Sequence, residues 1–324
     1  MWNFFKDPAW RWWSWGGTLV ILATLYGGVR LDAQINDWFG DFYNLIQRAL
    51  NYPDAVTMTD YFTSLSVFAG IAFVWIGVKL FANFLTQHWL FRWRTSMVEW
   101  YHEVFHKVHD LEGAAQRVQE DTVKFSRIVE SLGTALVESI LTLVVFFPIL
   151  LNLSWYFPVT FFGDWDYGLV AGAVIWTVGG TIFMATLSWV LRLVGVEYDI
   201  QVKEAAYRDM LVHTQKDGEK RPKTFNELFA DVRQIHFKNY IRYLYFNIGR
   251  LAYYQANVLT AYIFLAPAIV GGFITLGVMQ QVVRAFGKVE SSMQYLINSW
   301  PTIIELASVH KRLAEFEAKI KERG

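Results

Sequence analysis

Glutamates that lie within or beside long apolar segments are the residues of this chain best suited to proton chemistry. Burial disfavours the charged form of a carboxyl group, so such a residue can bind and release a proton near neutral pH. Glu138 is the most deeply embedded, and it follows Glu130 by eight residues, which places both on roughly one helical face. The full set of candidates is Glu130, Glu138, Glu197, Glu204, Glu290 and Glu305. For Glu197 and Glu204 the alternative is a solvated ion pair, because Lys203 and Arg208 are near in sequence.

A second group of residues matches a zinc-protease pattern. His102, Glu103 and His106 form a literal HExxH, in which two histidines one turn apart could hold Zn²⁺ while the glutamate activates water. His109 adds a third imidazole on nearly the same face. The alternative is a chance match in a histidine-rich helix, because a pattern with three fixed positions recurs often.

The elements that position these residues are expected to be membrane-spanning helices. Of the 324 residues, 54% are hydrophobic and 18% are charged, against about 25% charged in an average soluble domain. The apolar residues fall in blocks near the length of about 20 residues that a bilayer core requires. We predict an all-α membrane protein with six spans, at 12–29, 61–90, 134–153, 169–191, 243–266 and 273–300. Without a cleavage site, the first span is expected to be retained. Lys79 interrupts the second span and should face a partner or a cavity.

The distribution of basic residues predicts the topology. The connections 31–60, 152–168 and 267–272 carry one basic residue, Arg48, so the positive-inside rule places both termini on the cytoplasmic side. The arms 91–133 and 192–242 are then cytoplasmic too, as is a helix over 303–324. The arms have helical patterning, so the spans should continue into them as long helices. This predicts a single transmembrane domain over 1–324, with the shape of an ABC exporter by analogy.

The sequence also bears on the energy source and on partners. A P-loop ATPase needs GxxxxGK[ST] to hold phosphates, and no such string occurs in these 324 residues. We therefore expect no ATP hydrolysis by these residues, although the arms could dock a separate ATPase. The formal net charge of zero gives no indication of nucleic-acid binding, no cysteine is present, and no cofactor is expected.

Several segments resemble the SbmA/BacA family of bacterial inner-membrane peptide transporters. They are FRWRT at 91–95, EGAAQRVQEDTVKF at 112–125, VEYDIQVKEAAYR at 196–208, ITLGVMQQ at 274–281 and FGKVESSMQYLINSWPTIIEL at 286–306, with DWFGDFYNLIQRAL at 37–50 similar to the first external segment. The resemblance covers about residues 30 to 316. It implies a homodimer with an ABC-exporter-like fold and no ATPase domain, and proton-driven import of peptides, antimicrobial peptides and peptide-like antibiotics.

The resemblance also bears on the candidate residues. The family is thought to use a ladder of glutamates, and Glu130, Glu197, Glu204 and Glu305 fall on its glutamate positions, whereas Glu138 matches none. The HExxH string is not part of the family pattern. Family members carry an additional N-terminal span, and this chain starts later than they do.

Aromatic residues in the later spans could line a path for peptides: Trp176, Tyr253, Tyr254 and Tyr295. The alternative is anchoring at the interface and helix packing. Two other functions stay open at this point. One is the membrane subunit of an ABC transporter that uses a separate ATPase, and the other is a membrane zinc protease.

Overall fold

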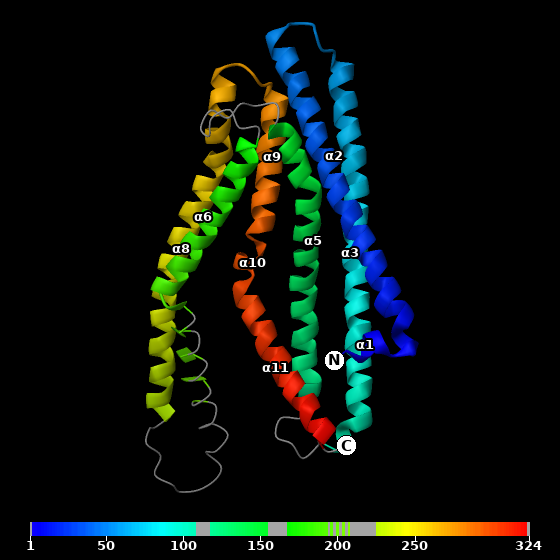
Figure 1. Cartoon of the computed structure of the whole chain (residues 1–324), viewed down its shortest axis with the longest axis vertical. Helices are drawn as coiled ribbons and strands as arrows, with labels where there is room; N and C mark the ends of the chain where they lie inside the picture. The colour runs from blue at the N-terminus through cyan, green and yellow to red at the C-terminus, as the bar shows by residue number, and fades with distance from the viewer. Residues whose placement is uncertain are drawn as a thin grey trace. The chain divides into compact units, whose positions relative to one another are not determined.

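Figure 1 shows the computed structural model of the chain, which describes residues 2–107, 117–154, 167–193, 195–196, 199–200, 203–204, 207 and 225–322. Every regular element within these residues is a helix, which confirms the all-α prediction for them. The long helices are α2 (Gly17–Asn51), α3 (Met58–Val104), α5 (Thr122–Ser154), α6 (Gly168–Val190), α8 (Phe225–Val270), α9 (Leu276–Met293) and α11 (Trp300–Glu322). The short elements are α1 (Asn3–Lys6), η1 (Pro8–Trp10), the π-helix η2 (Trp12–Gly16), η3 (Phe105–Lys107), the π-helix η4 (Arg117–Asp121) and α10 (Tyr295–Asn298).

Four helices within the described residues are long and apolar enough to cross a membrane. They are Met58–Val104, Val118–Ser154, Gly168–Val190 and Asn226–Val270. The predicted spans 61–90, 134–153 and 243–266 lie within three of these helices, and the predicted span 169–191 matches the fourth to within one residue at each end. The count of six spans and the exporter-like arrangement stay predictions, as does the assignment of residues 1–324 to a single domain.

Two of these helices are much longer than a bilayer is thick. α3 has 47 residues and α8 has 46, which at 1.5 Å per residue is about 70 Å, against about 30 Å for the hydrocarbon core. This confirms that the second and fifth spans continue as helices beyond their apolar stretches. The start of α3 is fixed by a capping box, in which Thr57 and Asp60 each accept a hydrogen bond from the other's backbone N–H.

The first span needs a correction. We predicted a span at 12–29 followed by a connection over 31–60, but α2 is one continuous helix from Gly17 to Asn51. Gly27, Gly28 and the charged residues after them lower the local hydropathy without breaking the helix. Three polar side chains of its second half, those of Asp37, Asn44 and Gln47, form hydrogen bonds with α9, which offset the cost of removing them from water.

The last predicted span, 273–300, is not one helix either. It is divided into α9, α10 and the start of α11, and the turn after α8 falls at 271–275, later than predicted. Proline has no backbone N–H to continue a helical ladder, and Pro301 lies just after the break between α10 and α11. The predicted tail helix 303–324 is accordingly part of α11, which begins at Trp300.

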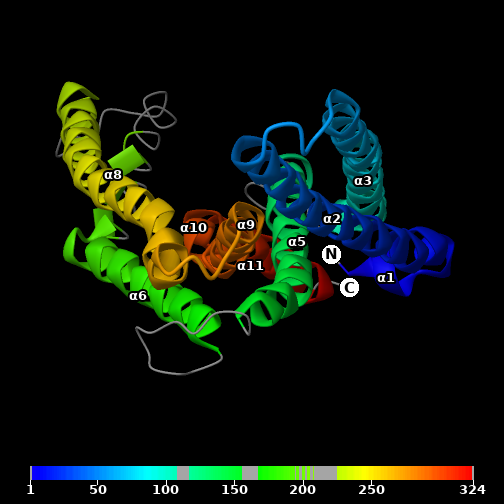
Figure 2. The ribbon, with the colours of Figure 1, turned by 90° about the horizontal axis from the view of Figure 1, so that it is seen from above.

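The chain divides into two compact units, the first being Met1–Val174 with Phe264–Gly324. In this unit α2 contacts α3, α5 and α9, and α5 also contacts α3, α9 and α11 (Figure 1 and Figure 2). An apolar core in this unit joins the ends of α3, α5 and α11 with the N-terminal segment. Fully buried side chains at its centre include Phe4, Met97, Tyr101, Leu313 and Phe316.

The second unit, Ile175–Ile263, contains most of α6 and of α8. The two helices pack closely because glycines lie at their contacts. A Cβ atom at Gly180 would lie 2.2 Å from the hydroxyl of Tyr253, and one at Gly249 would lie 2.4 Å from Leu187. Small residues at such positions allow the backbones of two membrane helices to approach closely.

Candidate functional site

The most distinctive polar contact in the first unit is an ion pair between two candidate membrane-spanning helices. Nζ of Lys79 on α3 donates to Oε1 of Glu138 on α5, and the two side chains are 25% and 38% exposed. The expectation that Lys79 meets a partner is therefore confirmed. Its partner is the acid that the sequence places deepest in apolar surroundings.

The local packing brings the lysine to this position. A Cβ atom at Gly28 of α2 would lie 3.5 Å from Cε of Lys79, so the stem of the lysine runs along the surface that the glycine leaves open. The indole of Trp75, one turn earlier on α3, lies 5.6 Å from the ammonium group and adds a weak cation–π contact. Three helices thus build the site, because α2 supplies the space, α3 the cation and α5 the anion.

The opposite charges of Lys79 and Glu138 join α3 to α5. Removal of either side chain would leave an uncompensated charge between apolar helices, where it is costly.

The other predicted coupling glutamates lie apart from this pair. Glu130 is half-buried on α5, two turns before Glu138, and its carbonyl accepts a hydrogen bond from the hydroxyl of Thr134. Glu305 is exposed on α11. Their roles in coupling stay predictions.

Two members of the set fall in or next to the second arm. Glu204, in the second unit, is exposed and contacts Nε2 of His236 at 3.1 Å. Glu197 lies outside the described residues. A further candidate from the sequence, Glu290, does not belong to this arm: it is on α9 and is buried, with 4% exposure. The partner of Glu204 among the described residues is thus His236; Arg208, one of the two cations expected from the sequence, lies outside them.

Three of the four aromatic residues proposed for a peptide path lie together in the second unit. The rings of Trp176 and Tyr253 are stacked, with centroids 5.5 Å apart, and Tyr253 is 9% exposed. Nε1 of Trp176 donates to Oδ1 of Asn257 at 2.9 Å. Tyr254 is next to Tyr253 and more exposed. These contacts fit helix packing, and a role in a path stays a prediction.

The fourth aromatic residue, Tyr295, is in the first unit. Its hydroxyl donates to the carbonyl of Leu132 on α5 at 2.6 Å, so the polar end of the side chain is occupied within the unit. This bond ties α10 to the helix that carries Glu130 and Glu138.

A polar seam between α2 and α9 was missed by the sequence analysis, which treated residues 31–60 as a connection. Oδ1 of Asp37 accepts from Nε2 of Gln281 at 3.0 Å, and Lys288 pairs with Asp32 at 3.4 Å. Burial is the main cause that raises the pKa of Asp37 above its usual value, and the bond from Gln281 opposes the shift.

A signal for this seam was present in the sequence. Polar or small residues recur at 32, 36, 40, 44 and 47. They are spaced three or four residues apart, as on one face of a helix. The side chains of Asn44 and Gln47 accept hydrogen bonds from the backbone N–H groups of Gly277 and Leu276, which begin α9.

The zinc pattern gains no support from the described part of the chain. His102 and Glu103 lie in the last turn of α3 and His106 lies in η3, and all three are exposed. His109 falls outside the described residues. Within the described part of the chain, no group of three or more histidine, aspartate or glutamate side chains is placed so that it could hold a metal ion.

Comparison with known proteins identifies a family and several similar relatives. Residues 7–321 match the SbmA/BacA-like family. The chain is 24% identical over 323 residues to the inner membrane ABC transporter ATP-binding protein YddA of Escherichia coli K12, covering 94% of this chain and 57% of that protein. It is also 24% identical over 327 residues to an uncharacterized ABC transporter ATP-binding protein of Synechocystis, covering 94% of this chain and 46% of that protein. The chain thus spans about half the length of these relatives.

Proposed function

Because the chain belongs to the SbmA/BacA-like family, we propose that it forms the membrane part of a transporter that imports peptides and peptide-like antibiotics, driven by a proton gradient. It would act as a homodimer in a bacterial inner membrane, with both termini cytoplasmic, and without chemical conversion of its cargo. Four long apolar helices support the membrane location. The resemblance of the sequence to peptide transporters supports the cargo class.

The observation that carries the proton coupling is the Lys79–Glu138 pair. An ionisable pair between apolar helices is costly to maintain and is a functional-site hypothesis by default. In this proposal a proton from the outside neutralises Glu138, the contact between α3 and α5 is released, and the pair forms again when the proton leaves to the inside.

The energy available is sufficient for such a switch. One charge that crosses a potential of about 100 mV gains about 2.3 kcal/mol. This corresponds to roughly a fiftyfold change in the ratio of two conformations. A single proton per cycle can therefore reverse a modest preference for the paired state.

The test is uptake of a fluorescent peptide into proteoliposomes that contain only this protein, with an inward proton gradient and no ATP. We expect uptake that a protonophore abolishes and that Glu138→Gln reduces at least tenfold. Glu99→Gln, which removes an exposed carboxylate from the same unit, should keep wild-type uptake. Equal uptake by Glu138→Gln and wild type would refute the role of the pair.

A second set of conditions distinguishes transport driven by a proton gradient from transport driven by ATP. ATP is supplied on the cytoplasmic side, with and without a copurified nucleotide-binding chain. Uptake that needs ATP and ignores the protonophore would contradict proton coupling and favour an ABC transporter subunit. Absence of uptake under both conditions, with folded protein in the vesicles, would overturn the proposal that this chain suffices for peptide transport.

A further inference from the structure

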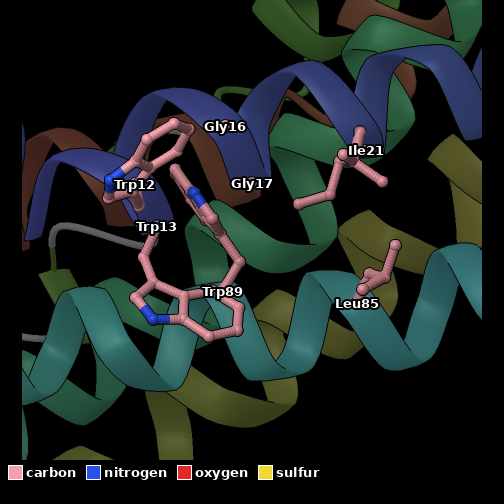
Figure 3. Close-up of a pocket in the computed structure, with 8 residues that line it drawn as sticks. Trp12, Trp13, Gly16, Gly17, Ile21, Leu85 and Trp89 are labelled. Atoms are coloured by element: carbon pink, nitrogen blue, oxygen red, sulfur yellow. The ribbon is translucent and has the colours of Figure 1, made fainter.

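The π-helix η2, the N-terminal end of α2 and the middle of α3 line an open cavity that the proposed transport function does not use. Its volume is about 350 Å³, at the lower end of the range of roughly 300–1,000 Å³ found for small-molecule sites. Figure 3 shows Trp12, Trp13 and Trp89 at one end of it, with Ile21 and Leu85 at the other.

The walls of this cavity are largely apolar. Nε1 of Trp89 donates to the carbonyl of Ser14 at 3.3 Å, and Ser14 itself is fully buried. The ring of Trp89 therefore presents carbon atoms to the cavity. It approaches α2 closely at Gly17, where a Cβ atom would lie 2.6 Å from Cδ1 of the indole.

The π-helix η2 shapes the outer wall. Its wider turn carries Trp12, Trp13 and Trp15 on consecutive or near-consecutive positions, and Trp12 is 87% exposed. Such local π-helices are frequently found at functional sites. Exposed tryptophans at the start of an apolar helix are typical of the headgroup level of a membrane.

A cation lies directly beside the apolar cavity. The guanidinium carbon of Arg92 lies 3.6 Å from the centre of the Trp13 ring, and Nη1 bonds to the carbonyl of His88 at 3.2 Å. Within the described residues, Nη2 and Nε of Arg92 have no hydrogen-bond partner and can donate to an anionic oxygen. Arg11 immediately precedes η2 and is exposed, which adds positive charge, and Asp7 is the acid nearest to it in sequence.

We propose that this cavity binds one acyl chain of an anionic phospholipid, whose phosphate is held by Arg92. The apolar walls fit a hydrocarbon chain, and the adjacent guanidinium fits a headgroup phosphate. The predicted topology places this end of α2 and α3 at the cytoplasmic leaflet, where anionic lipids attract basic residues near the membrane. The inference does not depend on the cargo or on the energy source of transport.

The headgroup part of the proposal is tested with two lipids that share their acyl chains. The whole protein is placed in mixed micelles with dioleoyl phosphatidylglycerol and dioleoyl phosphatidylcholine, and retained lipids are counted by native mass spectrometry. We expect phosphatidylglycerol to be retained preferentially, and Arg92→Gln to weaken its retention roughly tenfold, since a hydrogen bond to a charged group is lost. Arg48→Gln, a cation at the other end of α2, should leave retention unchanged.

The acyl-chain part is tested by filling the cavity. Val20 lines it, whereas its neighbour Leu19 does not and is 71% exposed. Val20→Trp should reduce retention of both lipids, and Leu19→Trp should not. If Val20→Trp loses helicity, Leu85→Trp fills the same space from α3. Equal retention of the two lipids by wild type, or equal effects at positions 19 and 20, would overturn the proposal.

Discussion

Gly277 should be the position on α9 least tolerant of a side chain. A Cβ atom there would lie 2.0 Å from the backbone oxygen of Gly40 on α2 and 2.5 Å from Cγ of Asn44. A flexible side chain can move aside, but the carbonyl of Gly40 belongs to a long helix. A carbon and a carbonyl oxygen approach to about 3.3 Å at closest. The substitution Gly277→Ala therefore has to separate the helices locally by about 1.3 Å, the difference between 3.3 and 2.0 Å.

This separation also removes polar contacts. The N–H of Gly277 donates to Asn44 at 3.1 Å, and the N–H of Leu276 donates to Gln47 at 2.8 Å. Each net contribution is about 1 kcal/mol, and overpacking adds about 1–3 kcal/mol. We expect Gly277→Ala to cost roughly 3–5 kcal/mol in total, on the basis of these two terms.

The assay is thermal unfolding in detergent, followed by loss of helical circular dichroism. A change of 1 kcal/mol shifts the Tm of a domain of 150–250 residues by about 2–4 °C, so a decrease of roughly 6–20 °C is expected. The matched control is Gly287→Ala on the same helix, where a Cβ atom would meet nothing within 4 Å. That variant should be neutral or slightly stabilising, because alanine favours a helix. Equal Tm values for the two variants would refute the close contact between α2 and α9.

Two further predictions concern the second unit and the seam. Gly180→Ala should lower the Tm by several degrees, because its Cβ would lie 2.2 Å from Tyr253, whereas Gly179→Ala, with nothing within 4 Å, should not. Asp37→Asn keeps an oxygen for the bond from Gln281 and removes a charge that burial disfavours. Since the pKa of Asp37 is raised in the folded state, the native state binds this proton more tightly than the unfolded chain does. The stability that this provides is lost as pH rises from the unfolded-state pKa of about 3.9 through the higher folded-state pKa. The variant should therefore be more stable than wild type at pH 7, and this gain should vanish below about pH 4; a lower Tm at pH 7 would contradict it.

The sequence predicts the long helices well, because apolar blocks with few breakers have one stable arrangement in a membrane. It also predicts that Lys79 needs a partner, since an isolated ammonium group is costly there. It does not identify Glu138 as that partner. Hydropathy locates a residue along a helix, but which residues its side chain meets depends on how the neighbouring helices pack. That packing is determined by contacts such as the one between Gly28 and the stem of Lys79.

The seam between α2 and α9 was missed for a related reason. Asp32, Asp37 and Asn44 lower the mean hydropathy, so a window average assigns the segment to a connection outside the membrane. Their polar groups are in fact matched by Lys288, Gln281 and the first N–H groups of α9. Because these matches join residues more than 200 positions apart, no local pattern contains them.

The two glycine contacts of α2 connect the ion pair to this seam. Gly28 faces the stem of Lys79, and Gly40 faces α9. The two glycines are twelve positions apart, which corresponds to about 18 Å along the helix and to a rotation of about 120° beyond three full turns, so the contacts lie on different faces. In the proposed coupling, α2 therefore offers a path from Lys79 to α9, because this one continuous helix contacts the lysine stem at Gly28 and α9 at Gly40.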